Sequence, residues 1–199
     1  MQPEEFYRPP QADLEIYTPQ PTQTQAQTLA PFFQTPPWKM ALLSVMSLGL
    51  YQLFWFHSHW TRRKTHGEKV SPLARSIFGA FFAYSLFDGV NRQIQQSAPP
   101  GLPLSAGAPL QPLSAGLLAL GYFALSLLWR LPENLGLFAG LLSILPLIAA
   151  QRRINELHAA LGYDPQEGSR LSGGDVAVLV LGGIFWLLIL ASLFMPAQG

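Results

Sequence analysis

The sequence predicts an all-α membrane protein with four transmembrane helices and one further membrane-associated helix. Two observations carry this prediction. Of the 199 residues, 49% are hydrophobic and only 12% are charged, which is about half the charged share of a typical soluble domain. Four long runs of the chain also contain no Asp, Glu, Lys or Arg. One soluble core of this size could not bury so much apolar surface.

Each uncharged run contains an apolar segment close to the ~20 residues that a helix needs to cross a bilayer. The predicted spans are 39–58, 112–130, 135–152 and 176–195. The second and third spans are separated only by a short turn that contains Pro132, so they are expected to form an antiparallel hairpin.

The segment 72–96 is expected to be a helix of a different kind. Only 12 uncharged residues lie between Arg75 and Asp88, and as a helix they extend about 18 Å, too little to cross unaided. We expect this helix to lie in the membrane interface or to dip partly into the bilayer. A tilted fifth transmembrane helix is the alternative. Asp88 and Arg92 are spaced i,i+4 and could form a buried ion pair.

The distribution of basic residues predicts an orientation. With four spans, nine of the 12 Lys and Arg residues fall on one side of the membrane and three on the other, whereas five spans give six and six. Because cytoplasmic loops are enriched in Lys and Arg, the uneven division is favoured. It places both termini outside the cytoplasm and the loops 62–92 and 152–170 inside.

Two regions flank or extend the predicted spans. Residues 1–37 contain eight prolines and seven glutamines and are predicted to be a flexible tail ahead of a helical domain over 38–199. Pro146 is expected to kink or loosen the third span. After that span, an amphipathic helix is expected to continue to Gly162, which would end it.

Glycines are the main candidates for helix packing. Gly136 and Gly140 form a GxxxG motif in the third span, and Gly182 and Gly183 lie in the middle of the fourth. Such residues let two helices approach closely in a bilayer. They could pack inside this chain, or they could form the seam of a dimer or a groove for a partner.

Residues that could carry chemistry are few. His57 and His59 are two apart, with His66 nearby, but on a helix side chains at i,i+2 point apart and would not share a metal. The chain has no cysteine and contains no nucleotide-binding, zinc-protease or nucleophile-elbow motif. We therefore expect no catalytic residues, no metal and no cofactor. The net charge of +1 argues against a nucleic-acid partner.

Several short motifs resemble a family of uncharacterised bacterial membrane proteins. Residues 47–51 (SLGLY), 54–56 (FWF) and 62–64 (RRK) have the order and spacing of that family's signature, and 151–155 (QRRIN) is also similar. The resemblance implies a multi-pass helical protein of the bacterial inner membrane. It brings with it no catalytic or binding residues.

These observations predict a non-catalytic, small integral inner-membrane protein that serves as an accessory or scaffolding subunit. The expected partners are the lipid bilayer and either other membrane subunits or a second copy of the chain. The alternative is a component of an oligomeric transporter or channel, because glycine-lined faces could serve either kind of assembly.

Overall fold

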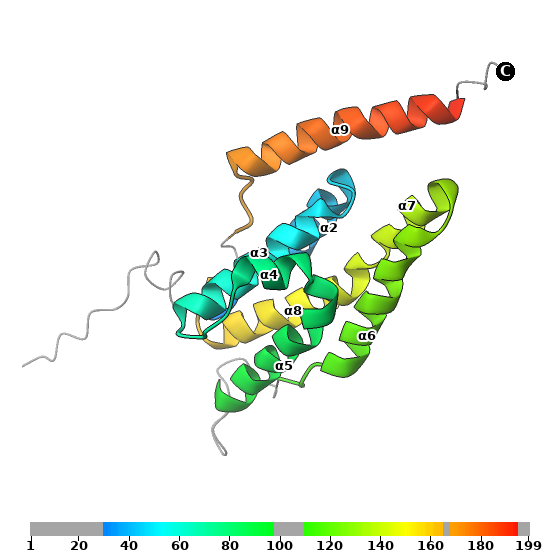
Figure 1. The fold of residues 1–199 in the computed structure, drawn as a ribbon. Coiled ribbons are helices and arrows are strands. Elements are labelled where there is room, and N and C mark those ends of the chain that lie inside the picture. The colour runs from blue at the N-terminus through cyan, green and yellow to red at the C-terminus, as the bar shows by residue number, and fades with distance from the viewer. Residues whose placement is uncertain (1–29, 98–109, 165–167, 195–199) are drawn as a thin grey trace, which may run out of the picture.

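A computed structural model describes residues 30–97, 110–164 and 168–194, and in these ranges all regular structure is helical (Figure 1). The predicted all-α class is therefore confirmed. The elements in chain order are α2 (Pro37–Met46), α3 (Leu50–Thr65), α4 (Pro72–Ile77), α5 (Gly79–Ser97), α6 (Ala115–Ser126), the 3₁₀ helix η1 (Leu127–Arg130), α7 (Glu133–Leu141), α8 (Ile144–Ala160) and α9 (Gly173–Phe194).

The first predicted span, 39–58, is wrong because the chain reverses within it. Leu48 and Gly49, between α2 and α3, have φ angles of +52° and +88°. These left-handed residues break the helix, and α3 then runs back along the segment that precedes α2. As a result, His66 Nε2 at the end of α3 lies 3.2 Å from the carbonyl oxygen of Ala30. The segment is a helical hairpin whose two ends lie at the same end of the bundle.

The second hairpin agrees with the sequence prediction. A turn at Leu131 and Pro132 joins η1 to α7, and α8 packs back against α6. Between α7 and α8, Leu142 and Ser143 keep helical backbone angles, but the α-helical hydrogen-bond pattern is interrupted, with i→i+3 bonds from Leu142 to Ala139 and from Leu145 to Leu142. Pro146 accounts for this break, because it has no N–H to donate to the carbonyl of Leu142 and its ring crowds that carbonyl.

The predicted helix over 72–96 forms as two pieces, α4 and α5, interrupted at Phe78. Ser71 and Pro72 begin α4 as expected. A Cβ on Gly79 would lie 2.8 Å from the Phe56 ring, so α5 begins in close contact with α3. The Arg75 guanidinium lies 4.5 Å from the centroid of the Trp60 ring, which fixes α4 against the same helix.

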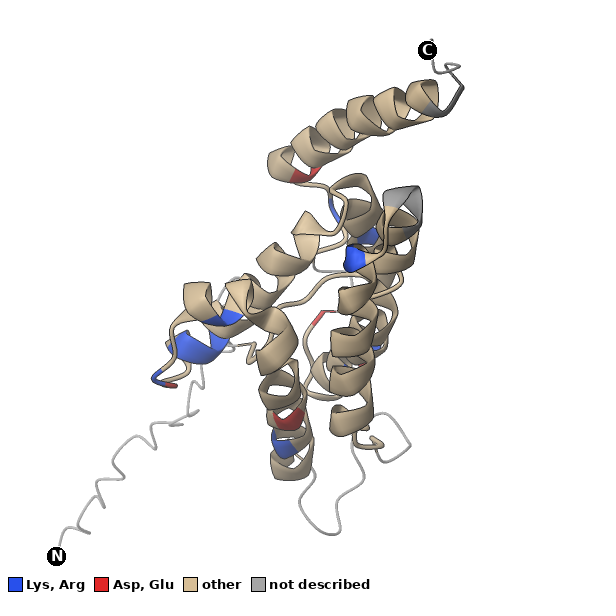
Figure 2. Ribbon diagram, turned by 45° about the vertical axis from the view of Figure 1, so that its right-hand side comes forward, with Lys and Arg blue, Asp and Glu red and all other residues tan. Residues whose placement is uncertain are grey.

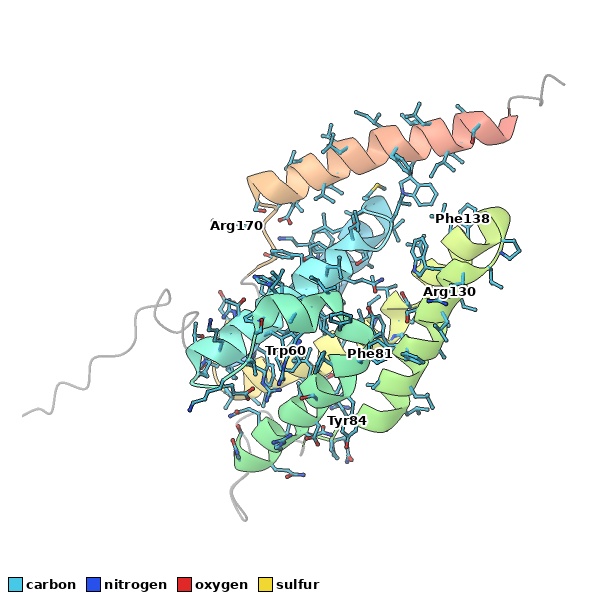
Figure 3. The ribbon with its side chains drawn as sticks, viewed as in Figure 1. Trp60, Phe81, Tyr84, Arg130, Phe138 and Arg170 are labelled. Carbon is cyan, nitrogen blue, oxygen red and sulfur yellow. The ribbon has the colours of Figure 1, made fainter. Side chains whose placement is uncertain are left out.

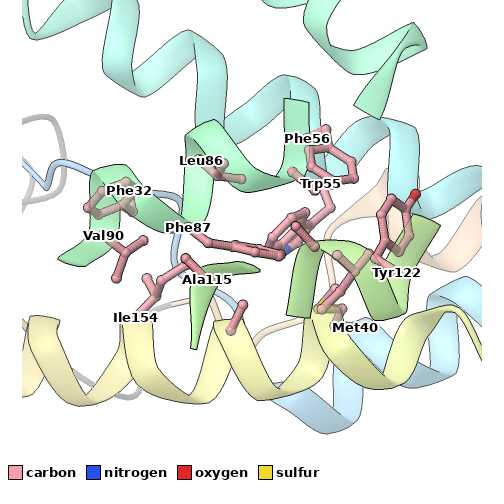
Figure 4. Close-up of a cluster of buried hydrophobic side chains, with 14 of the residues drawn as sticks. Phe32, Met40, Trp55, Phe56, Leu86, Phe87, Val90, Ala115, Tyr122 and Ile154 are labelled. Carbon is pink, nitrogen blue, oxygen red and sulfur yellow. The ribbon is translucent and has the colours of Figure 1, made fainter. Parts of the chain in front are cut away.

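Large apolar side chains from α3, α5 and α8 meet in one core (Figure 4). Burial of each such side chain contributes about 1.5–3 kcal/mol relative to exposure. The largest fully buried apolar residues are Trp55, Trp60, Phe56, Phe87, Met40, Leu43, Leu86, Leu147, Ile154 and Leu157. The last two confirm the predicted apolar face of the helix that extends past the third span, and Gly162, with a φ of +84°, follows the end of α8.

Two stretches of the described chain are long and apolar enough to cross a membrane, fewer than the four predicted. They are 136–160, which covers most of α7 and all of α8, and 173–192 in α9. The predicted span 112–130 becomes the shorter apolar helix Ala115–Arg130, about 24 Å long at the usual rise per residue. The alternative of five transmembrane helices differs even more from the two candidate spans of the described chain.

The first hairpin also brings together two residues that the four-span count separates. Lys39 Nζ donates to the carbonyl oxygen of Arg170 at 2.8 Å and pairs with Asp175 Oδ2 at 2.7 Å. The four-span count places Lys39 and Arg170 on opposite sides of the membrane. In the structure they are neighbours, so the start of α2 lies beside the loop before α9.

Candidate functional site

Residues 30–36, which we call the strap, form an extended segment along α3 and α8 immediately before α2. Its residues Ala30, Phe32, Gln34 and Thr35 are buried. The sequence assigns this segment to the flexible tail, and the structure corrects that boundary. The strap is ordered because the bundle offers hydrogen-bonding side chains to a peptide backbone. Residues 1–29 of the predicted tail lie outside the described residues.

Three side chains of the bundle bind main-chain atoms of the strap. The Phe33 N–H donates to His59 Nδ1 at 3.2 Å, and its carbonyl accepts from Gln151 Nε2 at 3.2 Å. Asn155 Nδ2 donates to the carbonyl of Thr35 at 3.0 Å. These bonds satisfy the backbone of a segment that has no neighbouring strand, as burial requires.

The same three side chains are linked to one another beneath the strap. Trp55 Nε1 donates to Gln151 Oε1 at 2.7 Å, and Gln151 Nε2 donates to Asn155 Oδ1 at 2.8 Å. Since His59 Nδ1 accepts from the strap, its Nε2 carries the proton and donates to Gln151 Oε1, 3.3 Å away. The two donors from α3 fix the amide orientation of Gln151.

His59 is neutral in this network. Burial of its ring holds the pKa well below 6.5; the hydrogen bond to Gln151 opposes this shift, and His158, Arg62 and Arg63 add to it. A second proton would occupy Nδ1, which must accept from the strap. The network therefore requires the uncharged imidazole.

Arg63 closes one end of the strap beside a polar cavity of about 260 Å³. Its guanidinium donates to Glu68 and to the carbonyl of Ser85, and it lies 5.9 Å from the centroid of the Phe32 ring. A Cβ on Gly89 would collide with this guanidinium, so Gly89 makes room for it. Because Glu68 already binds Arg63, the cavity offers no unpaired arginine to an anion.

The predicted packing glycines divide between inward contacts and open space. A Cβ on Gly136 would collide with the Leu131 carbonyl oxygen, and one on Gly140 would lie 2.5 Å from the Trp129 ring. Both therefore pack within their own hairpin. A Cβ on Gly182 would collide with the Met46 carbonyl oxygen, whereas one on Gly183 would meet nothing within 4 Å.

The other predicted residues do not converge on one site. Asp88 and Arg92 form their i,i+4 ion pair at 2.5 Å, but the Arg92 side chain is 63% exposed, so the pair lies on the surface of α5 and not in the interior. His57 is exposed on α3, whereas His59 is buried and His66 binds Ala30. No group of three His, Asp or Glu residues that could hold a metal occurs in the part of the chain that the structure describes.

Sequence reasoning missed the side chains that hold the strap. Gln151 and Asn155 lie where the third predicted span ends and the amphipathic helix was expected to begin, and Trp55 lies inside the first predicted span. One signal was available: Gln151 and Asn155 lie four apart and continue the apolar stripe of Ile154 and Leu157. No family model, curated protein or solved structure matches this chain.

Proposed function

We propose that this protein is a non-catalytic integral membrane protein of the bacterial inner membrane, acting as an accessory subunit of a membrane complex. The observation that carries the proposal is α9. Its 22 residues give a helix about 33 Å long, enough to cross the hydrocarbon of a bilayer.

The outer face of α9 has the chemistry of a lipid-facing surface. Within the most apolar 18-residue stretch of α9, only 11% is buried by the rest of the chain, compared with 39% for the corresponding stretch of 136–160. In Figure 2 the helix carries a single charged residue, Asp175 at its start. Each large aliphatic side chain on it would gain about 1.5–3 kcal/mol by leaving water. The outward residues are Val180, Leu181, Ile184, Leu187 and Leu188, all 53–68% exposed.

The inner face of α9 is held by a few specific contacts. Ser172 and Asp175 form a capping box, in which the Asp175 N–H donates to Ser172 Oγ at 3.2 Å and the Ser172 N–H donates to Asp175 Oδ2 at 2.7 Å. Lys39 pairs with the same carboxylate, and Trp186 Nε1 donates to the carbonyl of Val45 at 2.9 Å. These contacts anchor one side of α9 and leave bulky, branched residues for the lipid.

An accessory role fits the amide side chains between α3 and α8, because they hold the helices and the strap together. Gln52 Nε2 donates to Ser143 Oγ at 3.2 Å, and Gln151 is bonded to Trp55, Asn155 and the strap. Such pairs stabilise the packing of α3 against α8. The resemblance to bacterial membrane proteins without known catalytic residues supports the same proposal.

The absence of cysteine makes a direct test possible. We expect Leu181→Cys, in vesicles, to resist a membrane-impermeant maleimide until detergent is added. Lys64→Cys, on the exposed end of α3, is the matched control and should react when its side of the membrane faces the reagent. Equal reaction rates at both positions in intact vesicles would contradict membrane insertion of α9.

The accessory role needs a separate measurement. Purification in a mild detergent, followed by mass determination of the intact complex, should show a second membrane protein bound to this chain. A pure homo-oligomer would instead support the transporter or channel alternative. A monomer without partners would contradict both.

A further inference from the structure

We infer that the groove between α3 and α8 is a binding site for an extended peptide, and that the chain's own strap occupies it here as an exchangeable ligand. The expected partner is an extended segment with two adjacent aromatic residues followed by polar ones, as in the strap. This inference rests on the groove geometry and does not depend on membrane insertion.

The first argument is that the groove forms hydrogen bonds with main-chain atoms of the strap. His59 accepts from an N–H, while Gln151 and Asn155 donate to two carbonyl groups of the strap. Any extended peptide carries these groups at the same spacing. Backbone hydrogen bonds of this kind provide affinity in peptide-binding grooves, and side-chain pockets provide specificity.

The second argument is that the groove is assembled by its own contacts. The bonds from Trp55 and His59 to Gln151, and from Gln151 to Asn155, join α3 to α8 without any strap atom. A further hydrogen bond, from Gln52 on α3 to Ser143 at the start of α8, also involves no strap atom. The receptor side chains are thereby held in place before a peptide binds, which lowers the entropy lost on binding.

The third argument is that two aromatic positions give the site its selectivity. The Phe32 side chain is 2% exposed and belongs to the core cluster beside Val90 (Figure 4). The Phe33 ring packs edge-on against Phe54 and His59, with centroid separations of 5.9 and 6.0 Å. A peptide without both aromatic rings would lose these contacts and keep only the backbone bonds.

The test measures peptide binding to the full-length chain in mild detergent. The probe is a fluorescent peptide with the sequence of residues 30–37, followed by anisotropy. In the wild type the tethered strap has an effective concentration in the millimolar range, so we expect little binding. Phe32→Ser weakens the binding of the tethered strap to the groove. We therefore expect saturable binding of the free peptide, with at least a tenfold lower apparent Kd than for the wild type.

Two controls show whether the peptide occupies the groove. A peptide with N-methylphenylalanine at position 33 lacks the N–H that His59 accepts, and it should bind about fivefold to tenfold more weakly. Adding Asn155→Leu to Phe32→Ser should weaken binding similarly. Arg153→Ala, on the same helix but bonded to Glu156 at the surface, should leave it unchanged.

The outcome that overturns the inference is equally definite. If Phe32→Ser retains its helical circular dichroism but binds no peptide, the strap is a fixed part of the fold. Phe33→Pro, which also lacks the N–H, is a second weakened variant in case Phe32→Ser does not fold. Binding that is insensitive to both N-methylation and Asn155→Leu would place the peptide elsewhere and would also reject the site.

Discussion

At the scale of single residues, His59 and Gln151 determine how the strap is held. Gln151 uses both ends of its amide, accepting from Trp55 and donating to Asn155 and to the Phe33 carbonyl. A shorter or apolar side chain would leave buried donors without partners, at a cost of about 1–3 kcal/mol each. Lysine or arginine could not replace His59, because the atom in the place of Nδ1 must accept a hydrogen bond from the strap.

We predict that the neutral state of His59 makes stability depend on pH. The folded-state pKa is well below 6.5, so below pH 6.5 the unfolded state binds more protons and the free energy of unfolding falls. The slope approaches about 1.4 kcal/mol per pH unit, and this contribution is complete above pH 6.5. Thermal unfolding in mild detergent at a series of pH values measures it.

The control for this prediction is a pair of glutamine variants on the same helix. His59→Gln keeps a donor and an acceptor but cannot titrate, so its stability deficit relative to the wild type should shrink as the pH falls. His57→Gln changes an exposed ring and should reproduce the wild-type profile. A deficit for His59→Gln that stays constant between pH 5 and 8 would contradict the assignment.

At the scale of elements, the glycines of α9 show which face of the helix meets α2. Gly182 permits contact with the backbone of Met46, and Gly183, one residue on, faces open space. The GxxxG pair of α7 is used within its hairpin in the same way, against η1. Small residues in this chain therefore serve intramolecular packing at three of the four predicted positions.

We predict opposite effects for alanine at the two glycines of α9. Gly182→Ala places a methyl group against a backbone carbonyl and should destabilise the α2–α9 contact by about 1–3 kcal/mol. Gly183→Ala should be neutral or stabilising by up to about 1 kcal/mol, through helix propensity. Thermal unfolding compares the two, and equal destabilisation would show that Gly183 also faces a packed surface.

At the scale of the whole molecule, the two hairpins and α9 determine where the charges lie. In Figure 3, Arg130 lies at the turn end of the second hairpin, well away from Arg170 at the start of α9. Trp60 and Lys64 lie in the second half of α3, away from the Leu48–Gly49 turn. The basic residues Arg62, Arg63 and Lys64 thus lie at the end of α3 opposite its turn, whereas Arg130 lies beside the turn of the second hairpin.

We predict that single cysteines will report this arrangement. If the protein is inserted as proposed, Trp38→Cys and Lys64→Cys should react with an impermeant maleimide from the same side of the membrane, because the first hairpin does not cross. Sealed vesicles of known orientation provide the measurement. Reaction from opposite sides would restore 39–58 as a transmembrane span and reject the hairpin.

The features that depend on local chemistry could be predicted from the amino-acid sequence. It located the breaks and ends at Pro132, Pro146 and Gly162, the start of α4 at Ser71-Pro72 and the apolar character of α9. Proline and glycine act on the backbone within one turn of their own position, so no distant contact can easily override them. Composition likewise predicted helices that expose apolar side chains.

The way in which these elements pack against one another became visible in the three-dimensional structure. It turned 39–58 into a hairpin, because Leu48 accepts a left-handed conformation that its sequence does not favour. The strap lies in the groove because His59, Gln151 and Asn155 come together from helices about 90 residues apart in the chain. The packing of α9 also places Gly182, and not Gly183, in contact with α2. Each of these outcomes depends on atoms far away in the sequence, which no local pattern encodes.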